Sequence, residues 1–295
     1  MSNLYQRRMS LSGLDISGLS NDDLKNLVRK ILENKIHGLS FSPYVGDQGP
    51  GTVVTEEQIR ERLAIIAPYV NWIRSFSCTD GFELIPAIAK EMGLKTLVGV
   101  WLDDDHEHNE EELANALRIA AEGHVDLLGV GNEVLLRGDL TEDQLLDFIE
   151  RAKQGAPGVP VGYVDAYFEF VDHPRITQAC DVLMANCYPF WEGCAAEHAL
   201  LYMKEMYRRA SSVAGGKQVI VSETGWPNIG SPEGAAVPSF ENAVKYFVDT
   251  YRWAEEDGVE VYYFSSFDEN WKVGAEGDVG AYWGLWDKDG KPKYW

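Results

Sequence analysis

The chain has 295 residues, of which 45% are hydrophobic, 12% aromatic and 25% charged, and its formal net charge is −21. This composition is that of a globular protein with a sizeable core, and it excludes the disordered and fibrous classes. An acidic surface of this kind repels phosphate backbones and anionic lipid, so we expect no nucleic-acid partner. A neutral ligand is unaffected by the net charge.

The hydropathy pattern bears on membranes and on localisation. No run approaches the roughly 18 apolar residues of a transmembrane helix, and residues 1–15 lack the apolar segment of a signal peptide. We therefore expect no membrane insertion. The protein is expected to be either cytoplasmic or a trimmed form of a secreted or periplasmic one.

Short apolar runs rich in β-branched residues recur along the chain and predict strands. Nearly continuous hydrophobicity is typical of parallel strands that are covered on both faces. The predicted strands are Ile36–Phe41, Val70–Phe76, Lys95–Trp101, Val125–Val130, Val159–Val164, Asp181–Asn186, Gln218–Ser222 and Val259–Ser265.

Segments with helical periodicity and capping signals separate these runs. A threonine or serine precedes several of them, and a glycine follows several others, as is usual at helix ends. The predicted helices are Asn21–Glu33, Glu56–Tyr69, Ile85–Glu91, Glu110–Glu122, Glu142–Lys153, Glu197–Val213 and Glu241–Asp257, with a short irregular segment at Pro174–Cys180.

Eight strands alternating with helices, without a break in composition, predict an α/β protein built on a (β/α)₈ TIM barrel. We expect one catalytic domain over residues 1–295, with residues 1–35 as an N-terminal helical extension that packs on the barrel. An open, doubly wound sheet is the alternative. No glycine-rich phosphate loop follows any strand, which disfavours a nucleotide site.

Two glutamates directly follow predicted strands, where the active sites of such barrels lie. Glu133 follows the fourth strand and Glu223 the seventh, each in a turn that contains glycine. Two carboxyl groups about 5–5.5 Å apart cleave a glycosidic bond with retention, and a separation of about 6.5–9.5 Å gives inversion. The alternative is that both glutamates form salt bridges at the rim, but two of them at one end favour catalysis.

The motifs around these glutamates resemble those of glycoside hydrolase family 17, the retaining β-1,3-glucanases and related β-glucan transglycosylases. Gly131–Val134 and Ser222–Pro227 are the two glutamate motifs, and the second is the more specific. Asn186–Phe190 resembles the family motif after the sixth strand, while Phe267–Lys272 and Trp283–Leu285 are similar to its closing segments. The match runs in order over nearly the whole chain, and the resemblance is to a bacterial-type member of the family.

The resemblance implies roles for the residues of these motifs. Glu133 would be the general acid/base and Glu223 the nucleophile. Asn132 would donate a hydrogen bond to the 2-hydroxyl of the attacked sugar, and Tyr188 would hold the nucleophile.

Further substrate-binding residues follow from the same resemblance. Glu269 and Lys272 would shape the floor of the sugar site. Arg74 stands where the family carries an arginine that orients a glutamate, although pairing with another carboxylate is equally expected. Phe41 stands where the plant members have a tyrosine. Either the tyrosine hydroxyl near the attacked sugar is missing here, or Tyr44 supplies a hydroxyl in its place.

Four of the nine tryptophans stand just beyond predicted strands, namely Trp101, Trp191, Trp226 and Trp271. Aromatic rings offer apolar area to the flat face of a pyranose. Any single one of them could be a core residue, but four at one end favour a sugar-binding cleft. We expect Trp191 and Trp226 to bind substrate.

Two other features could carry chemistry. Asp103–His108 follows the third strand and could ligate a metal, but a solvated acidic loop is the stronger interpretation. Cys187 and Cys194 could bridge one loop, although free thiols are the default in a chain of this length. The family mechanism needs no metal, so we predict no cofactor.

These observations favour a retaining, endo-acting hydrolase of β-1,3-glucan that works as a monomer. A β-1,3-glucan transglycosylase would use the same two glutamates, with a sugar hydroxyl in place of water. A glucan-binding barrel without activity and a metal-dependent hydrolase that uses the Asp103–His108 loop are the other two hypotheses.

Overall fold

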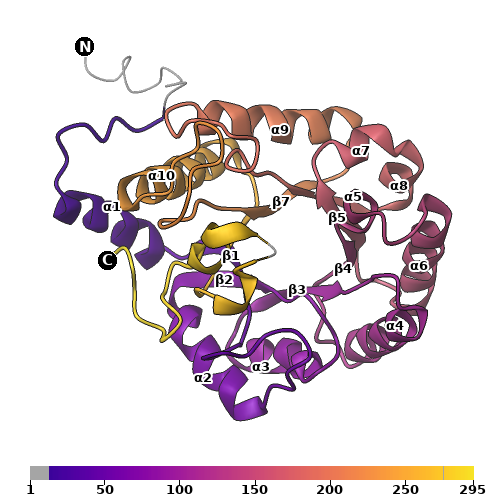
Figure 1. The fold of residues 1–295 in the computed structure, drawn as a ribbon. Helices are drawn as coiled ribbons and strands as arrows, with labels where there is room; N and C mark the ends of the chain where they lie inside the picture. Colours follow the sequence, from indigo (N-terminus) through magenta and orange to yellow (C-terminus); the bar gives the residue numbers. More distant parts are fainter. Residues whose placement is uncertain (1–12, 275) are drawn as a thin grey trace.

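The computed structural model describes residues 13–274 and 276–295, and its parallel strands close into a barrel in the order β1 to β8 (Figure 1). This confirms the predicted (β/α)₈ barrel and excludes the open sheet. The strands are β1 (Ile36–Ser40), β2 (Val70–Arg74), β3 (Lys95–Val100), β4 (Leu127–Asn132), β5 (Val161–Ala166), β6 (Val182–Asn186), β7 (Val219–Thr224) and β8 (Val261–Tyr263).

The helices surround the barrel and cover the outer faces of its strands (Figure 1). They are α1 (Asn21–Glu33), α2 (Glu56–Ile66), α3 (Ile85–Glu91), α4 (His106–Ala121), α5 (Val134–Arg137), α6 (Glu142–Gly155), α7 (Glu169–Asp172), α8 (Pro174–Ala179), α9 (Ala199–Val213) and α10 (Phe240–Asp257). Four 3₁₀ turns complete the described secondary structure, η1 (Ala67–Tyr69), η2 (Phe82–Leu84), η3 (Asn270–Lys272) and η4 (Gly277–Tyr282).

Helix α4 begins earlier than the sequence pattern predicts. The expected start is Glu110, whereas the helix begins at His106. The Asp105 side chain accepts hydrogen bonds from the backbone nitrogens of Glu107 and His108, which is the geometry of an N-cap. The second half of the Asp103–His108 stretch is therefore the first turn of a helix, and Asp105 caps it.

Three strands end later than predicted, at the side of the barrel where the two glutamates lie. Strands β4 and β5 each run two residues further, and β7 runs to Thr224. Glu223 is thus inside β7 rather than after it.

The strand pairing shifts register at Gly129/Asn132, at Ala185/Asn186 and at Val221/Thr224. Such irregularities redirect side chains and are frequent beside active sites.

The segment before β1 is held on α10. Helix α1 packs against α10, and the backbone nitrogen of Leu14 donates to Asp249 at 2.5 Å. Lys245 donates to the Leu14 carbonyl at 2.8 Å and pairs with Asp249 at 2.7 Å. Leu14 and α1 therefore contact α10, and residues 1–12 of the expected N-terminal extension lie outside the described part.

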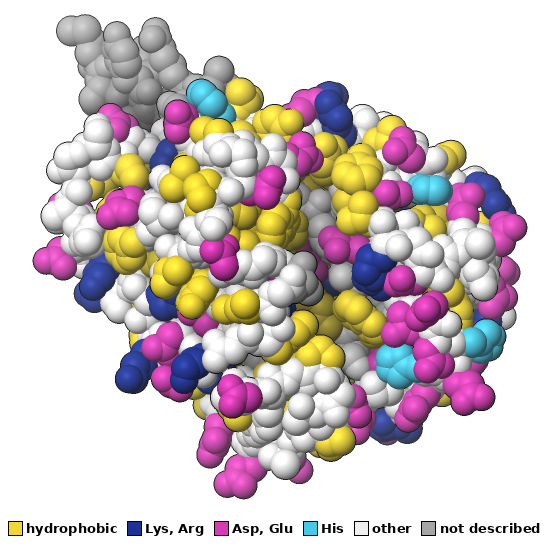
Figure 2. All heavy atoms as spheres, viewed as in Figure 1, with side chains coloured by type: hydrophobic (Ala, Val, Ile, Leu, Met, Phe, Trp, Pro, Cys, Tyr) yellow, Lys and Arg dark blue, Asp and Glu magenta, His cyan; other side chains and the backbone are white. Residues whose placement is uncertain are grey.

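The segment after β8 crosses the mouth of the barrel, where η3 and η4 lie in yellow at the centre of Figure 1. Backbone hydrogen bonds fasten it, from Ser265 to the Trp283 carbonyl at 3.1 Å and from Leu285 to the Ser265 carbonyl at 3.0 Å. Figure 2 shows this face hollowed near its centre, with hydrophobic side chains inside the hollow and acidic ones around it. The last segment of the chain therefore helps to shape the mouth.

Candidate active site

Glu223 is a buried carboxylate, 6% exposed, near the end of β7. Its Oε1 forms an ion pair with the Arg74 guanidinium of β2. The Tyr188 hydroxyl, from the loop after β6, donates a hydrogen bond to Oε2 at 2.7 Å. Donors on both oxygens stabilise the negative charge of a carboxylate, so Glu223 lies in an environment suited to an ionised nucleophile.

Glu133 occupies a different environment at the end of β4. It is the N-cap of α5 and has left-handed backbone angles, φ 52° and ψ 30°. Burial raises its pKa to about 7, with a further contribution from the charge of Glu223, while a hydrogen bond from Asn186 at 2.8 Å acts in the opposite direction. A protonated carboxyl near neutral pH is suited to general acid catalysis.

Asn186 and Arg74 join the two glutamates in one network. The Asn186 amide nitrogen donates to Glu133, and its oxygen accepts from the Ser222 hydroxyl at 2.8 Å. Arg74 contacts Glu223 through Nη1 and the Asn132 side-chain oxygen through Nη2 at 2.7 Å. Residues from β2, β4, β6 and β7 therefore meet in one cluster, as the positions of their motifs predict.

Glu269 and Lys272 form a second polar pair at the barrel mouth. Their side chains are nearly buried and approach to 2.6 Å. The Trp271 indole nitrogen donates to Glu269 at 3.0 Å, and the Lys272 ammonium lies 4.0 Å from the centre of the Phe264 ring. Half-buried Tyr44 contacts the edge of Trp271, with 6.3 Å between ring centres.

Glu276 is a fourth acid of the site, after Glu133, Glu223 and Glu269, and the sequence motifs do not indicate it. Its pKa is raised to about 7, chiefly by burial; the Lys272 ammonium opposes this shift, and the charges of Glu223, Glu269 and Glu133 add to it. Its backbone nitrogen donates to the Lys272 carbonyl at 3.3 Å. In the sequence, only the position of Glu276 four residues after Lys272 could have indicated it as a site residue. Nothing in the local sequence indicates that the chain folds back over the barrel there.

The predicted sugar-binding tryptophans differ in exposure. Trp191 and Trp271 are 39% and 38% exposed, and Trp101 is partly exposed. Trp226 is only 1% exposed, and its indole nitrogen donates to the Val237 carbonyl at 3.1 Å. The expected sugar contact of Trp226 is therefore corrected: its ring is a core residue that can offer no face to a ligand.

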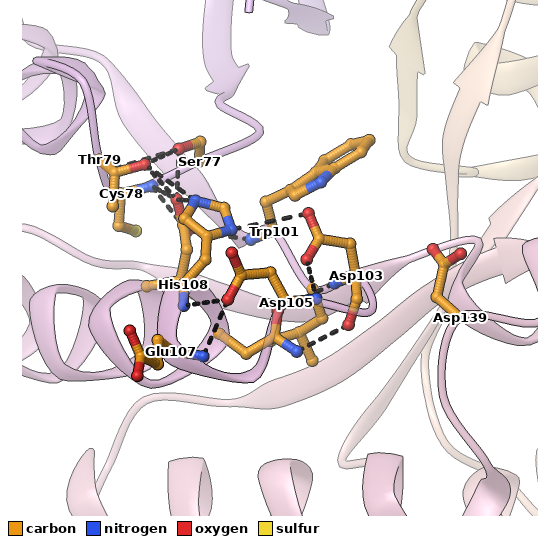
Figure 3. A network of polar contacts seen from close by, with 12 residues as sticks. Ser77, Cys78, Thr79, Trp101, Asp103, Asp105, Glu107, His108 and Asp139 are labelled. Carbon is orange, nitrogen blue, oxygen red and sulfur yellow. Dashed lines mark hydrogen bonds and ion pairs between the residues drawn. The ribbon is translucent and has the colours of Figure 1, made fainter. Parts of the chain in front are cut away.

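The Asp103–His108 stretch is engaged in local contacts (Figure 3). Asp103 accepts from the Asp105 backbone at 2.8 Å, and the His108 ring lies 3.6 Å from Asp103 and 3.7 Å from Glu112. Residues 13–274 and 276–295 contain no group of three or more His, Cys, Asp or Glu side chains that could hold a metal ion. The hydrogen bonds of Asp103 and Asp105 are those of an acidic loop that leads into a helix.

The four cysteines are free thiols, and all are described. Cys187 is buried, and burial raises the pKa of its thiol above the usual value. Cys194 is partly exposed. The possible disulfide across this loop is absent from the structure.

None of the helices in the described ranges is long and apolar enough to cross a membrane.

A parallel (β/α)₈ barrel with two carboxylates in contrasting environments at its rim is an architecture of glycoside hydrolases. Residues 38–284 match the family model of the BtgE/BtgC glycoside hydrolase domain. The chain belongs to this glycoside hydrolase family, in agreement with the family 17 resemblance of its motifs.

Individual relatives agree with this assignment. The chain is 30% identical over 243 residues to a glucan 1,3-beta-glucosidase of Arthroderma benhamiae, covering 75% of this chain and 78% of that protein. A glucan 1,3-beta-glucosidase of Schizosaccharomyces pombe is 30% identical over 263 residues, which are 83% of this chain and 82% of that one.

Solved structures are also similar. The family 17 beta-1,3-glucanosyltransferase from Rhizomucor miehei superposes with a TM-score of 0.78 at 29% identity, covering 88% of this chain and 96% of that chain. An active-site mutant of that enzyme has been solved in complex with laminaritriose. An endo-laminarinase from Formosa, at 18% identity and a TM-score of 0.75 over 90% of this chain and 87% of that one, shares the fold.

Proposed function

We propose that the chain is a retaining, endo-acting hydrolase of β-1,3-glucan, with Glu223 as nucleophile and Glu133 as general acid/base. The observation that carries this proposal is the contrast between the two carboxylates. Glu223 is held by Arg74 and Tyr188, whereas the pKa of Glu133 is raised to about 7. The substrate class is supported by the names of the relatives, which act on 1,3-β-glucans.

The reaction has two steps. In the first, Glu223 attacks the anomeric carbon while Glu133 protonates the departing glycosidic oxygen, which gives a covalent glycosyl-enzyme. In the second, ionised Glu133 takes a proton from a water molecule, which attacks the same carbon and releases Glu223. Two inversions give net retention, so we expect the carboxyl groups to lie about 5–5.5 Å apart.

The surrounding residues bind the sugar. The Asn132 oxygen accepts from Arg74, so we propose that its amide nitrogen donates to the 2-hydroxyl of the attacked sugar. Glu269 and Lys272 present charged groups to further hydroxyls, and Trp191 offers an exposed ring to a pyranose face. We propose that Tyr44, beside Trp271, supplies the hydroxyl that Phe41 lacks.

We also propose that the enzyme works as a monomer without a cofactor, because one chain supplies the acid, the nucleophile and the hydroxyl-binding groups. We propose that the chain is a bacterial-type rather than a plant-type member, because it has Phe41 where the plant members have a tyrosine. The Phe41 ring is buried against Phe267, with 6.4 Å between ring centres.

The alternative is a β-1,3-glucan transglycosylase, in which a sugar hydroxyl replaces water in the second step. The similarity to the Rhizomucor miehei glucanosyltransferase favours this alternative. Both reactions use the same glutamates and differ only in how well an acceptor sugar competes with water.

Timed product analysis tests the proposal. Laminarin, curdlan, lichenan and a β-1,6-glucan are incubated with the enzyme, together with a reduced laminari-oligosaccharide. Shortening of laminarin from internal positions supports endo-hydrolysis, and products longer than the oligosaccharide support transglycosylation. Binding of laminarin without any product would overturn both and leave a glucan-binding barrel. Loss of activity on chelation would favour the metal-dependent hydrolase.

A further inference from the structure

The backbone at Glu133 adopts a conformation that its surroundings must hold. Gly131 has φ 82° and Glu133 has φ 52°, so the chain turns sharply between β4 and α5. A non-glycine residue in the left-handed region is strained and persists only where neighbouring groups fix it. The position of the Glu133 carboxyl therefore depends on what holds this turn.

Arg137, one helical turn further along, contacts the turn on both sides of Glu133. Its guanidinium donates through Nη1 to the Asn132 carbonyl, directly before Glu133. Its backbone nitrogen donates to the Glu133 carbonyl at 2.8 Å. Asp139 orients the guanidinium, accepting from Nε at 2.7 Å. The side chain is 30% exposed, so this support lies on the solvent side of the turn.

The same guanidinium reaches the end of the neighbouring strand. Nη2 donates to the Leu102 carbonyl at 2.9 Å, and the guanidinium carbon lies 4.8 Å from the centre of the Trp101 ring. Figure 3 shows the Trp101 side chain, which directly follows β3, and Asp139, which lies in the loop after α5. Arg137 therefore ties the β3 end to the turn that carries Glu133.

The buried side of the turn has its own support. The Tyr163 hydroxyl of β5 accepts from the Leu135 backbone nitrogen at 2.9 Å and donates to the buried carboxyl of Asp165. This hydrogen bond holds the start of α5. It does not involve the Asn132 carbonyl, which accepts from Arg137 instead. The two supports act on opposite sides of Glu133 and do not replace one another.

We propose that Arg137 is a positioning residue that holds the Glu133 carboxyl where it can protonate the glycosidic oxygen. This inference rests on the proposed function of Glu133. The planar guanidinium of Arg137 donates hydrogen bonds to two carbonyls and a carboxylate, and it also lies over the Trp101 ring. The single ammonium group of a lysine cannot make all these contacts at once.

A leaving-group series tests the proposal. Aryl β-laminaribiosides with phenols of different acidity share one sugar part, so a change at a sugar-binding residue affects them all alike. In the Arg137→Lys variant, kcat/KM is expected to fall about 30- to 100-fold for the poorest leaving groups. It is expected to stay within about 3-fold for the dinitrophenyl glycoside, which needs little protonation. The plot of log kcat/KM against phenol pKa becomes steeper.

Arg151 provides a matched control. It also pairs with a carboxylate, Glu110, and lies over an aromatic ring, Phe148 at 5.1 Å, but on the outer helices. Arg151→Lys should leave the slope unchanged. In Arg137→Ala, added guanidinium should restore cleavage of the poor leaving groups more than added ammonium does.

Two results are distinguishable. If wild type cleaves the glycosides and Arg137→Lys lowers kcat/KM equally for all leaving groups, or not at all, Arg137 does not position the acid and the inference is overturned. If wild type cleaves none of them and does not act on laminarin, the proposed function itself has failed.

Discussion

The Tyr188 hydroxyl donates a 2.7 Å hydrogen bond to Oε2 of Glu223, the oxygen that the Arg74 ion pair does not use. The two donors come from the loop after β6 and from β2, so they approach the carboxylate from different parts of the barrel. Tyr188 also packs edge-on against Trp283, with 5.6 Å between ring centres. Its hydroxyl is thereby fixed before any ligand binds.

Removing that hydroxyl should slow the reaction more than it weakens binding. In Tyr188→Phe, we expect kcat to fall about 10- to 100-fold with a small change in KM, because a hydrogen bond to a charged group contributes about 1.5–3 kcal/mol. Steady-state kinetics on laminarin would measure this. Tyr251→Phe is the control, since Tyr251 donates to the Gly38 carbonyl at 3.2 Å away from the two glutamates. Equal losses in both variants would contradict a specific role for Tyr188.

Glu223→Ala should abolish turnover, because no nucleophile remains to form the glycosyl-enzyme. Added azide or formate can enter the space left by the carboxylate and attack the anomeric carbon of an activated β-glycoside. The expected product is the α-configured adduct, identified by NMR. A β-configured azide product from this variant would assign the nucleophile role to another residue.

Glu133→Ala should give the opposite pattern. Natural glucans need protonation of the leaving oxygen, so their kcat/KM should fall about 10²- to 10⁴-fold, while aryl glycosides with good leaving groups are less affected. Azide should then yield the β-glycosyl azide, because the covalent intermediate still forms on Glu223. An α-anomer as the first product of the wild-type enzyme would mean inversion and would overturn both roles.

The pKa of about 7 at Glu133 predicts the alkaline limb of the pH profile. The first step requires protonated Glu133, and the protonated fraction decreases as pH rises through the pKa. The kcat/KM for laminari-oligosaccharides should therefore fall about tenfold per pH unit above about pH 7. This limb should be absent for the dinitrophenyl glycoside, in the wild type as in Glu133→Gln, because that substrate needs little protonation. A limb that stays in place in that variant would belong to another group, with Glu276 as the first candidate.

Glu112 makes a prediction about stability. Its buried carboxylate accepts from the Ser77 and Thr79 hydroxyls and from the backbone nitrogens of Cys78 and Trp101. Glu112→Ala leaves these donors without their acceptor, so we expect the free energy of unfolding to fall by roughly 2–4 kcal/mol.

Denaturant titration would measure this loss, with Glu111→Ala as the control because Glu111 is the exposed neighbour on α4. A loss below about 0.5 kcal/mol, the range of ordinary surface substitutions, would show that the network contributes little.

The barrel and the residues at its rim are predictable from the pattern of the sequence. Parallel strands covered on both faces need apolar side chains on both sides, so their positions are visible as continuous apolar runs. Glu133 and Glu223 follow or end such runs, and the topology brings strand ends together whatever the details of packing. Helices α1 and α3 also begin and end where local capping and periodicity predict.

The exposure of the rim residues and the charges of the acids among them depend on the three-dimensional packing. Trp191 and Trp226 both follow strands, but Trp226 is covered by Phe190 and Tyr246, whose rings lie 5.2 and 5.4 Å away. Glu276 joins the site because the segment after β8 folds back over the mouth. The raised pKa of Glu133 arises from burial and from the charge of Glu223. Burial and charge are sums over neighbours that are distant in the chain, and no local pattern contains them.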